Sequence, residues 1–385
     1  MSPALLSSSP RSLNANGCIQ DPLENQYQKG VLHLSEIGIK NVPRKYVFPV
    51  SERPEMNLKK GKSSSHKGDG NLHLPIIDVA ELQGPRRAEA LKALSSACEN
   101  YGFFQVVNHG VPVEAISNMM DAAKRFFALP TSEKEKYMSP DLSKAVRYGT
   151  SFNQLRDRVF CWRDFLKFVC HPLEDVISDW PSSPVDFREL AVTYAKETKM
   201  LFHTIADAVL ESLGLSNARM TTDDQDDETL KEIKNGGQSM IINYYPSCPE
   251  PDLTIGLRPH SDFGVLTLLL QDEVPGLQIK HQGKWFTVEP IPGSFVINVG
   301  DQLEIFSNGR YKSVVHRVIT NSEKSRISVA SFHSFPFPSV VRPCERLITE
   351  TNPRNYKETS FASFVDYMKS TDYKEKSFLE SLKLT

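Results

Sequence analysis

The chain has 385 residues, 39% hydrophobic and 24% charged, which suffices for one sizeable core with additions or for two small domains. Its net charge of −2 gives no reason to expect nucleic acid or an acidic membrane as a partner. It has no apolar run near the roughly 18 residues of a membrane span and no secretion signal, and its six scattered cysteines favour reduced thiols. We therefore expect a cytoplasmic protein. We also expect a monomer that acts on a small molecule.

The N-terminal part of the chain divides by composition. Residues 1–30 are polar and rich in Ser and Asn, which predicts disorder. Residues 31–72 contain a short helix, an extended stretch and a flexible linker rich in Lys, Ser and Gly. Residues 73–235 carry apolar side chains at helical spacing, which predicts helices over 116–127 and over 190–213, the second ended by Gly214.

The central part of the chain changes to β character. Residues 236–340 hold short β-type runs broken by Gly, Pro and Asn, at 239–245, 263–270, 285–288, 294–299, 313–320 and 326–333. Such spacing is typical of a barrel or jelly roll. Residues 341–385 return to a helical pattern. The predicted fold class is α+β: a jelly-roll core, buttressing helices and an N-terminal α/β layer.

One pattern predicts a metal site. His260 and Asp262 form an H-x-D in a β-rich stretch, and residues i and i+2 of a strand face the same side. His316 can supply a third ligand from a facing strand. Of the other nine histidines, none has Asp or Glu two positions on. Two imidazoles and one carboxylate that leave coordination positions open are typical of non-haem Fe(II) oxygenases.

A second pattern predicts an anion site. Arg326 lies ten residues after His316, and its guanidinium can hold a carboxylate by two parallel hydrogen bonds, with the Ser328 hydroxyl beside it. Arg326-Ile327-Ser328 is the only R-x-S in the chain. An open iron site beside an anchored dicarboxylate indicates a 2-oxoglutarate-dependent oxygenase.

From about residue 40 onward the chain resembles the plant Fe(II)- and 2-oxoglutarate-dependent dioxygenases. The resemblance rests on several motifs in order: Leu74-Pro-Ile-Ile-Asp78, Ala97 to Val111, Asn243-Tyr-Tyr-Pro-Ser-Cys-Pro249, Pro275-Gly-Leu-Gln278 and Asn298-Val-Gly-Asp301. It implies a double-stranded β-helix core. It also implies that Asn243 and Tyr245 lie near 2-oxoglutarate. Two further motifs, at 150–153 and 161–164, are similar to the flavanone 3-hydroxylase-like and downy-mildew-resistance-type oxygenases.

The substrate pocket is less well defined by the sequence. Similarity to flavonoid-type members implies that Phe165, Ile241 and Phe332 line it. Phe152, Phe263 and Phe335 are further apolar candidates near the same motifs. For each side chain, core packing is an equal alternative. If these residues do line the pocket, it suits a flat phenolic or a polycyclic terpenoid better than a sugar or an amino acid.

The expected function is hydroxylation or desaturation of a small apolar plant metabolite, such as a flavonoid, a phenolic, a gibberellin or another terpenoid. The resemblance implies Fe(II), 2-oxoglutarate and O2 as reactants, succinate and CO2 as products, and support by ascorbate. Two alternatives remain open. One is a catalytically silent binding protein on the same fold, and the other is an oxidase of the family that does not use 2-oxoglutarate.

Overall fold

The computed structural model describes residues 29–54, 73–139, 141–151, 154, 157–215, 225–371 and 375–384. The predicted disordered N-terminus up to residue 28, the linker at 55–72 and Phe152 lie outside the described residues. Within the described residues, Cys98, Cys161, Cys170 and Cys248 are free thiols, and they are buried, as is Cys344. No described helix combines the length and apolar character needed to cross a membrane.

The two helices predicted from apolar spacing are confirmed. They are α3 (Val113–Phe127) and α6 (Phe187–Ser212), and Gly214 follows α6 with a positive φ of 83°, which glycine adopts without strain. The other helices are α1 (Val31–Glu36), α2 (Arg87–Asn100), α4 (Thr131–Glu135), α5 (Leu173–Val176), α7 (Gln225–Lys234), α8 (Asp301–Phe306), α9 (Phe361–Ser370) and α10 (Ser377–Ser381).

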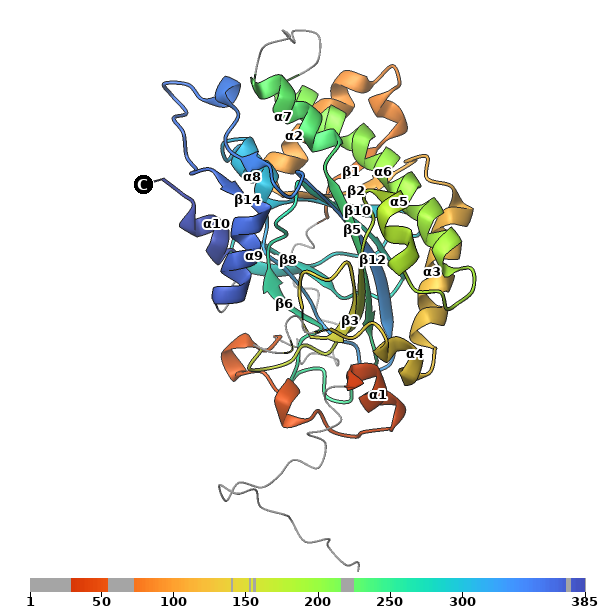
Figure 1. Cartoon of the computed structure of the whole chain (residues 1–385). Coiled ribbons are helices and arrows are strands. Elements are labelled where there is room, and N and C mark those ends of the chain that lie inside the picture. The colour runs from red at the N-terminus through yellow and green to blue at the C-terminus, as the bar shows by residue number, and fades with distance from the viewer. Residues whose placement is uncertain are drawn as a thin grey trace, which may run out of the picture.

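The strands form the two layers of the predicted jelly roll (Figure 1). The large sheet has the order β1 (Ile76–Asp78), β2 (Phe103–Val107), β10 (Phe295–Val299), β7 (Leu266–Gln271), β12 (Arg326–Ser334), β5 (Gly237–Tyr245), β4 (Asp164–Val169) and β3 (Val146–Thr150). The small sheet has the order β6 (Leu257–His260), β11 (His316–Val318), β8 (Leu277–His281) and β9 (Lys284–Thr287). A short pair, β13 (Val340–Val341) and β14 (Thr359–Ser360), lies apart from both sheets.

The large sheet crosses the domain boundary that we predict between residues 235 and 236. Strands β1 to β4 precede that boundary, yet β2 pairs with β10 and β4 pairs with β5. The N-terminal α/β layer is therefore continuous with the core sheet, and the individual domain limits remain predictions.

The two faces of the large sheet differ in character. On β12, Ile327 and Val329 belong to the main hydrophobic core, which also contains buried side chains of α3 and α6. The alternate residues Arg326, Ser328, Ala330 and Phe332 point the other way, because side chains alternate along a strand. We call the side that carries these four residues the inner face. In Figure 1, α3 and α6 flank the opposite side of the sheet, and the small sheet is on the side of α9 and α10.

Candidate metal centre

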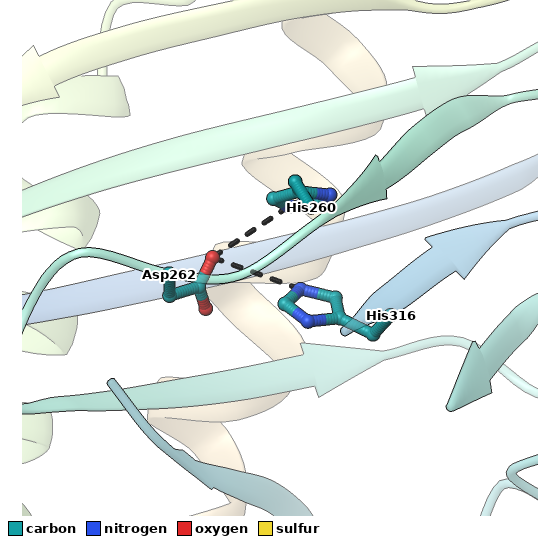
Figure 2. Close-up of side chains that lie close together, drawn as sticks. All are labelled: His260, Asp262 and His316. Carbon is teal, nitrogen blue, oxygen red and sulfur yellow. Dashed lines mark ion pairs between the residues drawn. The ribbon is translucent and has the colours of Figure 1, made fainter. Parts of the chain in front are cut away.

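His260, Asp262 and His316 come together as one cluster (Figure 2). The Nε2 atoms of both histidines lie 3.6 Å from Oδ1 of Asp262, and the potential ligand atoms all lie within 4.8 Å of one another. All three side chains are buried. The predicted H-x-D and the distant His316 thus form one compact set of potential metal-binding atoms.

The small sheet positions the two histidines. His260 ends β6 and is directly paired with His316 of the neighbouring antiparallel strand β11. Each Nδ1 atom lies at hydrogen-bonding distance from a backbone carbonyl oxygen two residues earlier, 2.8 Å for His260 with Arg258 and 3.1 Å for His316 with Val314. These contacts favour the tautomer in which Nδ1 carries the proton and Nε2 keeps its lone pair for a metal.

Asp262 is positioned differently from the prediction. It lies two residues beyond the end of β6, outside the strand on which we expect it. Its backbone oxygen accepts a hydrogen bond from the Asp301 backbone nitrogen at 2.7 Å, and its Oδ2 accepts from Thr267 Oγ1 at 2.7 Å and Asn298 Nδ2 at 2.8 Å. The large sheet therefore holds one carboxylate oxygen and leaves Oδ1 directed at the histidines.

The protonation states fit a divalent cation. Burial, followed by repulsion from His316, lowers the pKa of His260 and keeps it neutral. Burial alone would raise the pKa of Asp262, but the two imidazoles and the hydrogen bonds from Thr267 and Asn298 hold it below its usual value. Two imidazoles and one carboxylate are a donor set that suits Fe(II) and leaves room for further ligands.

Arg326 lies at the start of β12 on the inner face and is 3% exposed. Its Nη2 donates to Gln271 Oε1 at 2.7 Å and its Nη1 to Ser328 Oγ at 3.4 Å, while its buried Nε has no hydrogen-bond partner in the described part of the chain. Burial lowers its pKa, while Tyr245 and the carboxylate of Asp272 oppose this shift. A buried guanidinium that keeps an N–H group without a partner among the described residues can bind a carboxylate.

Glycine is required beside this arginine. A Cβ atom at Gly276 would stand 2.8 Å from Cδ of Arg326, too close without a shift of one of the two chains. The Pro275-Gly276 motif thus leaves space for the arginine side chain.

Asn243 and Tyr245 lie on β5 beside this group, opposite Ser328 and Arg326 respectively. The Tyr245 ring centroid is 5.4 Å from the guanidinium carbon of Arg326. Asn243 Oδ1 accepts a hydrogen bond from Arg163 Nη1 at 3.0 Å. The two side chains share the inner face with Arg326, and their contact with 2-oxoglutarate remains a prediction.

The aromatic candidates separate into two groups. Phe165 lies opposite Asn243, Ile241 lies opposite Ala330, and Phe332 alternates with Arg326, so all three belong to the inner face. Phe263 instead stacks on Phe364 at a centroid distance of 4.2 Å, within a hydrophobic cluster of the C-terminal helices.

Phe335 also packs elsewhere, in the main core with Phe306 at 6.2 Å between centroids. Phe263 and Phe335 are thus packing residues in this fold, and we leave both out of the pocket.

Sequence reasoning missed Thr267 and Gln271. Both lie on β7, four residues apart, as polar side chains that alternate with Leu266, Leu268 and Leu270. Polar residues at alternate positions indicate that this face of β7 points toward the site. The leucines around them make the whole run look apolar, which conceals the pattern. Asn298 belongs to the Asn298-Val-Gly-Asp301 motif, but no feature of the sequence predicts its hydrogen bond to Asp262.

The chain matches two family models. Residues 236–334 match the 2OG-Fe(II) oxygenase superfamily, and residues 74–184 match the N-terminal region described as non-haem dioxygenase in morphine synthesis.

Individual relatives cover nearly the whole chain. Protein DMR6-LIKE OXYGENASE 2 of Arabidopsis thaliana is 42% identical over 90% of this chain and 95% of its own length. Flavanone 3-dioxygenase 2 of Oryza sativa subsp. japonica is 41% identical over 88% of this chain and 93% of its own length. A crystal structure of JOX2 in complex with 2OG, Fe and JA superposes with a TM-score of 0.79 at 33% identity, covering 92% of this chain and 98% of that one.

Proposed function

Because the chain belongs to the 2OG-Fe(II) oxygenase superfamily and is a 2-oxoglutarate-dependent dioxygenase, we propose that it hydroxylates or desaturates a small apolar plant metabolite. The substrate classes that we propose are flavonoids, other phenolics, gibberellins and other terpenoids. The single observation that supports this proposal best is the inner face itself, where apolar side chains share one side of the sheet with the buried Arg326 and with Thr267, which donates to Asp262.

Each residue has a defined task in this proposal. His260, Asp262 and His316 hold Fe(II), while Thr267 and Asn298 fix the carboxylate orientation. Arg326 and Ser328 bind the far carboxylate of 2-oxoglutarate, with Asn243 and Tyr245 beside it. Bound iron and 2-oxoglutarate supply the oxidising chemistry, in which O2 is consumed and succinate and CO2 are released. Phe165, Ile241 and Phe332 orient the substrate and exclude water.

The names of relatives support the breadth of these classes. Among them are a flavanone 3-dioxygenase, a feruloyl CoA ortho-hydroxylase and jasmonate-induced oxygenases. Those names apply to the relatives, and they make a screen across several metabolite classes the appropriate test.

The test measures succinate formed from 2-oxoglutarate by the Fe(II)-loaded protein with flavanones, salicylate, gibberellins and other terpenoids. We expect at least one compound to raise succinate release in equal amount with its oxidised product. The His260→Ala variant, which lacks one ligand, is expected to fold but to release none. Oxidised product without succinate would favour the family oxidase that does not use 2-oxoglutarate, and binding without either product would favour the silent binding protein.

A further inference from the structure

The C-terminal segment, residues 361–371 and 375–384, follows the part of the chain that matches the oxygenase superfamily model, which ends at residue 334. In Figure 1 its helices α9 and α10 lie on the side of the small sheet. The Glu375 backbone oxygen accepts a hydrogen bond from the Ser261 backbone nitrogen at 3.4 Å, and Glu375 pairs with His260 in an isolated parallel bridge. The C-terminal segment thus contacts the outer edge of β6, at the residues that begin the H-x-D.

The residue that follows the H-x-D is enclosed by the same segment. The Phe263 ring is 5% exposed, stacks on Phe364 of α9 and meets Phe378 of α10 edge-on at 5.5 Å between centroids. Because Phe263 follows Asp262 directly, a shift of the Asp262 backbone would disrupt these aromatic contacts. The two helices therefore restrain the turn that carries Asp262.

Lys376 extends this restraint to the third ligand. It lies between Glu375 and α10, and its ammonium donates to Oε2 of Glu304 at 3.0 Å and to the Ser313 backbone oxygen at 2.7 Å. The Ser313 backbone nitrogen donates to the same Glu304 oxygen at 2.6 Å. Lys376 and Glu304 therefore hold both polar backbone groups of Ser313, which lies three residues before His316.

Glu304 belongs to α8, and this helix also holds the H-x-D turn. At its start, the Asp301 backbone nitrogen donates to the Asp262 backbone oxygen at 2.7 Å, and Ser261 Oγ donates to Asp301 Oδ2 at 3.1 Å. Both ligand-bearing segments are therefore hydrogen-bonded to one short helix whose six residues are all buried. Lys376 connects that helix to the C-terminal segment.

The charge of Lys376 matches its position. Glu304 is 2% exposed, and within the described residues its one ion pair is with Lys376. The other donors to its carboxylate, the Tyr356 hydroxyl at 2.8 Å and the Ser313 backbone nitrogen, are uncharged. Loss of the cation would leave a buried carboxylate without compensation, which costs more than the pair itself contributes. The carboxylate can reduce this cost by turning toward water, and it then releases Ser313 and loosens the strand that carries His316.

We propose that Lys376 is a positioning residue of the metal centre. Together with Glu304 it fixes the approach to His316, while the contacts of Glu375 and Phe263 fix the H-x-D turn. The C-terminal segment therefore keeps the two ligand-bearing segments in register with each other. This inference rests on the three metal ligands assigned above and is independent of the substrate.

The test measures Mn(II) binding, in place of Fe(II), from the electron paramagnetic resonance signal of the unbound ion. We expect Lys376→Met to raise the dissociation constant about tenfold, the lower end of the range typical for residues that orient metal ligands. Lys376→Arg keeps a cation with several donors and should recover most of the affinity. In the metal-free Lys376→Met protein, hydrogen–deuterium exchange should be faster over residues 257–263 and 313–318 and unchanged over α3 and α6.

The matched control is Lys383→Met, which removes another lysine of the same segment, paired with Glu380 at 2.8 Å on the surface. It should bind Mn(II) like the unmodified protein. A role of Lys376 in overall stability alone predicts a lower melting temperature with unchanged Mn(II) affinity and unchanged local exchange. That result would overturn the proposal, and so would an equal loss of affinity in Lys383→Met.

Two further variants complete the test. If Lys376→Met exchanges rapidly in every peptide, it has not folded, and Lys376→Gln, which keeps a neutral donor, takes its place. A smaller loss of Mn(II) affinity in the same direction is then expected, and unchanged affinity would again overturn the proposal. His260→Ala tests the ligand assignment separately, because full Mn(II) affinity in that variant would refute the metal site itself, whatever the result at Lys376.

Discussion

Replacement of Thr267 by valine tests whether the large sheet controls the metal centre. Valine has nearly the same shape as threonine but cannot donate the hydrogen bond of 2.7 Å to Asp262 Oδ2. Asn298 then remains as the other side-chain donor to that oxygen, at 2.8 Å. The carboxylate gains freedom to rotate, and Oδ1 is no longer fixed toward the two histidines.

The expected loss follows from the type of bond. A hydrogen bond to a charged group contributes about 1.5–3 kcal/mol, and about 1.4 kcal/mol corresponds to a factor of ten. If most of this contribution stabilises the metal-bound orientation, Fe(II) affinity falls by about tenfold to a hundredfold, the range typical for residues that orient metal ligands. The dissociation constant can be measured anaerobically by competition with a coloured chelator.

Thr198→Val is the matched control. Thr198 is equally buried, but its hydroxyl donates to the backbone oxygen of Tyr194 at 2.8 Å within α6, on the helical side of the sheet. Both variants are expected to lose some thermal stability, whereas only Thr267→Val should lose iron affinity. Equal iron affinity in Thr267→Val and the unmodified protein would refute the role assigned to this hydrogen bond.

Two further predictions concern the inner face. Arg326→Lys keeps the charge but loses one of two parallel hydrogen bonds, so the 2-oxoglutarate KM in steady-state assays should rise about tenfold with little change in iron affinity; an unchanged KM would place the co-substrate elsewhere. Phe332→Ala should alter the product distribution in chromatographic analysis more than the melting temperature, whereas a loss of about 3–5 kcal/mol of stability with unaltered products would make Phe332 a core residue.

The sequence predicts the metal ligands well because their spacing has a direct geometric meaning. His260 and His316 have no close neighbours of the same type in sequence, yet their β-rich surroundings already indicate facing strands, and the ladder pairs them directly. The predicted strand from 263 begins only at Leu266, and Gly264 before it passes so close to the His333 backbone that a Cβ would stand 2.6 Å from its oxygen. Contacts of this kind arise from tertiary packing and leave no periodic signal.

The rest of the site depends on pairings across long distances in sequence. The sequence gives no hint of the role of Gln271, because only the register of β7 against β12 sets it opposite Ser328 and within reach of Arg326. The short strand β8 is also missed, because five residues that include several polar side chains do not form a recognisable pattern. Phe263 and Phe335 show the converse error, in which proximity to a motif is mistaken for proximity to the site.

The strand order of the large sheet has a consequence for how the chain reaches its native state. β2 pairs with β10, and β4 pairs with β5, so neither pair can form until the later strand has been synthesised. During synthesis from the N-terminus, strands β1 to β4 therefore leave the ribosome with unpaired edges that are open to other chains. Because closing such large loops is entropically costly, folding is expected to be slow and largely post-translational. A fragment that stops before residue 236 would keep those edges permanently open, and aggregation is its expected fate.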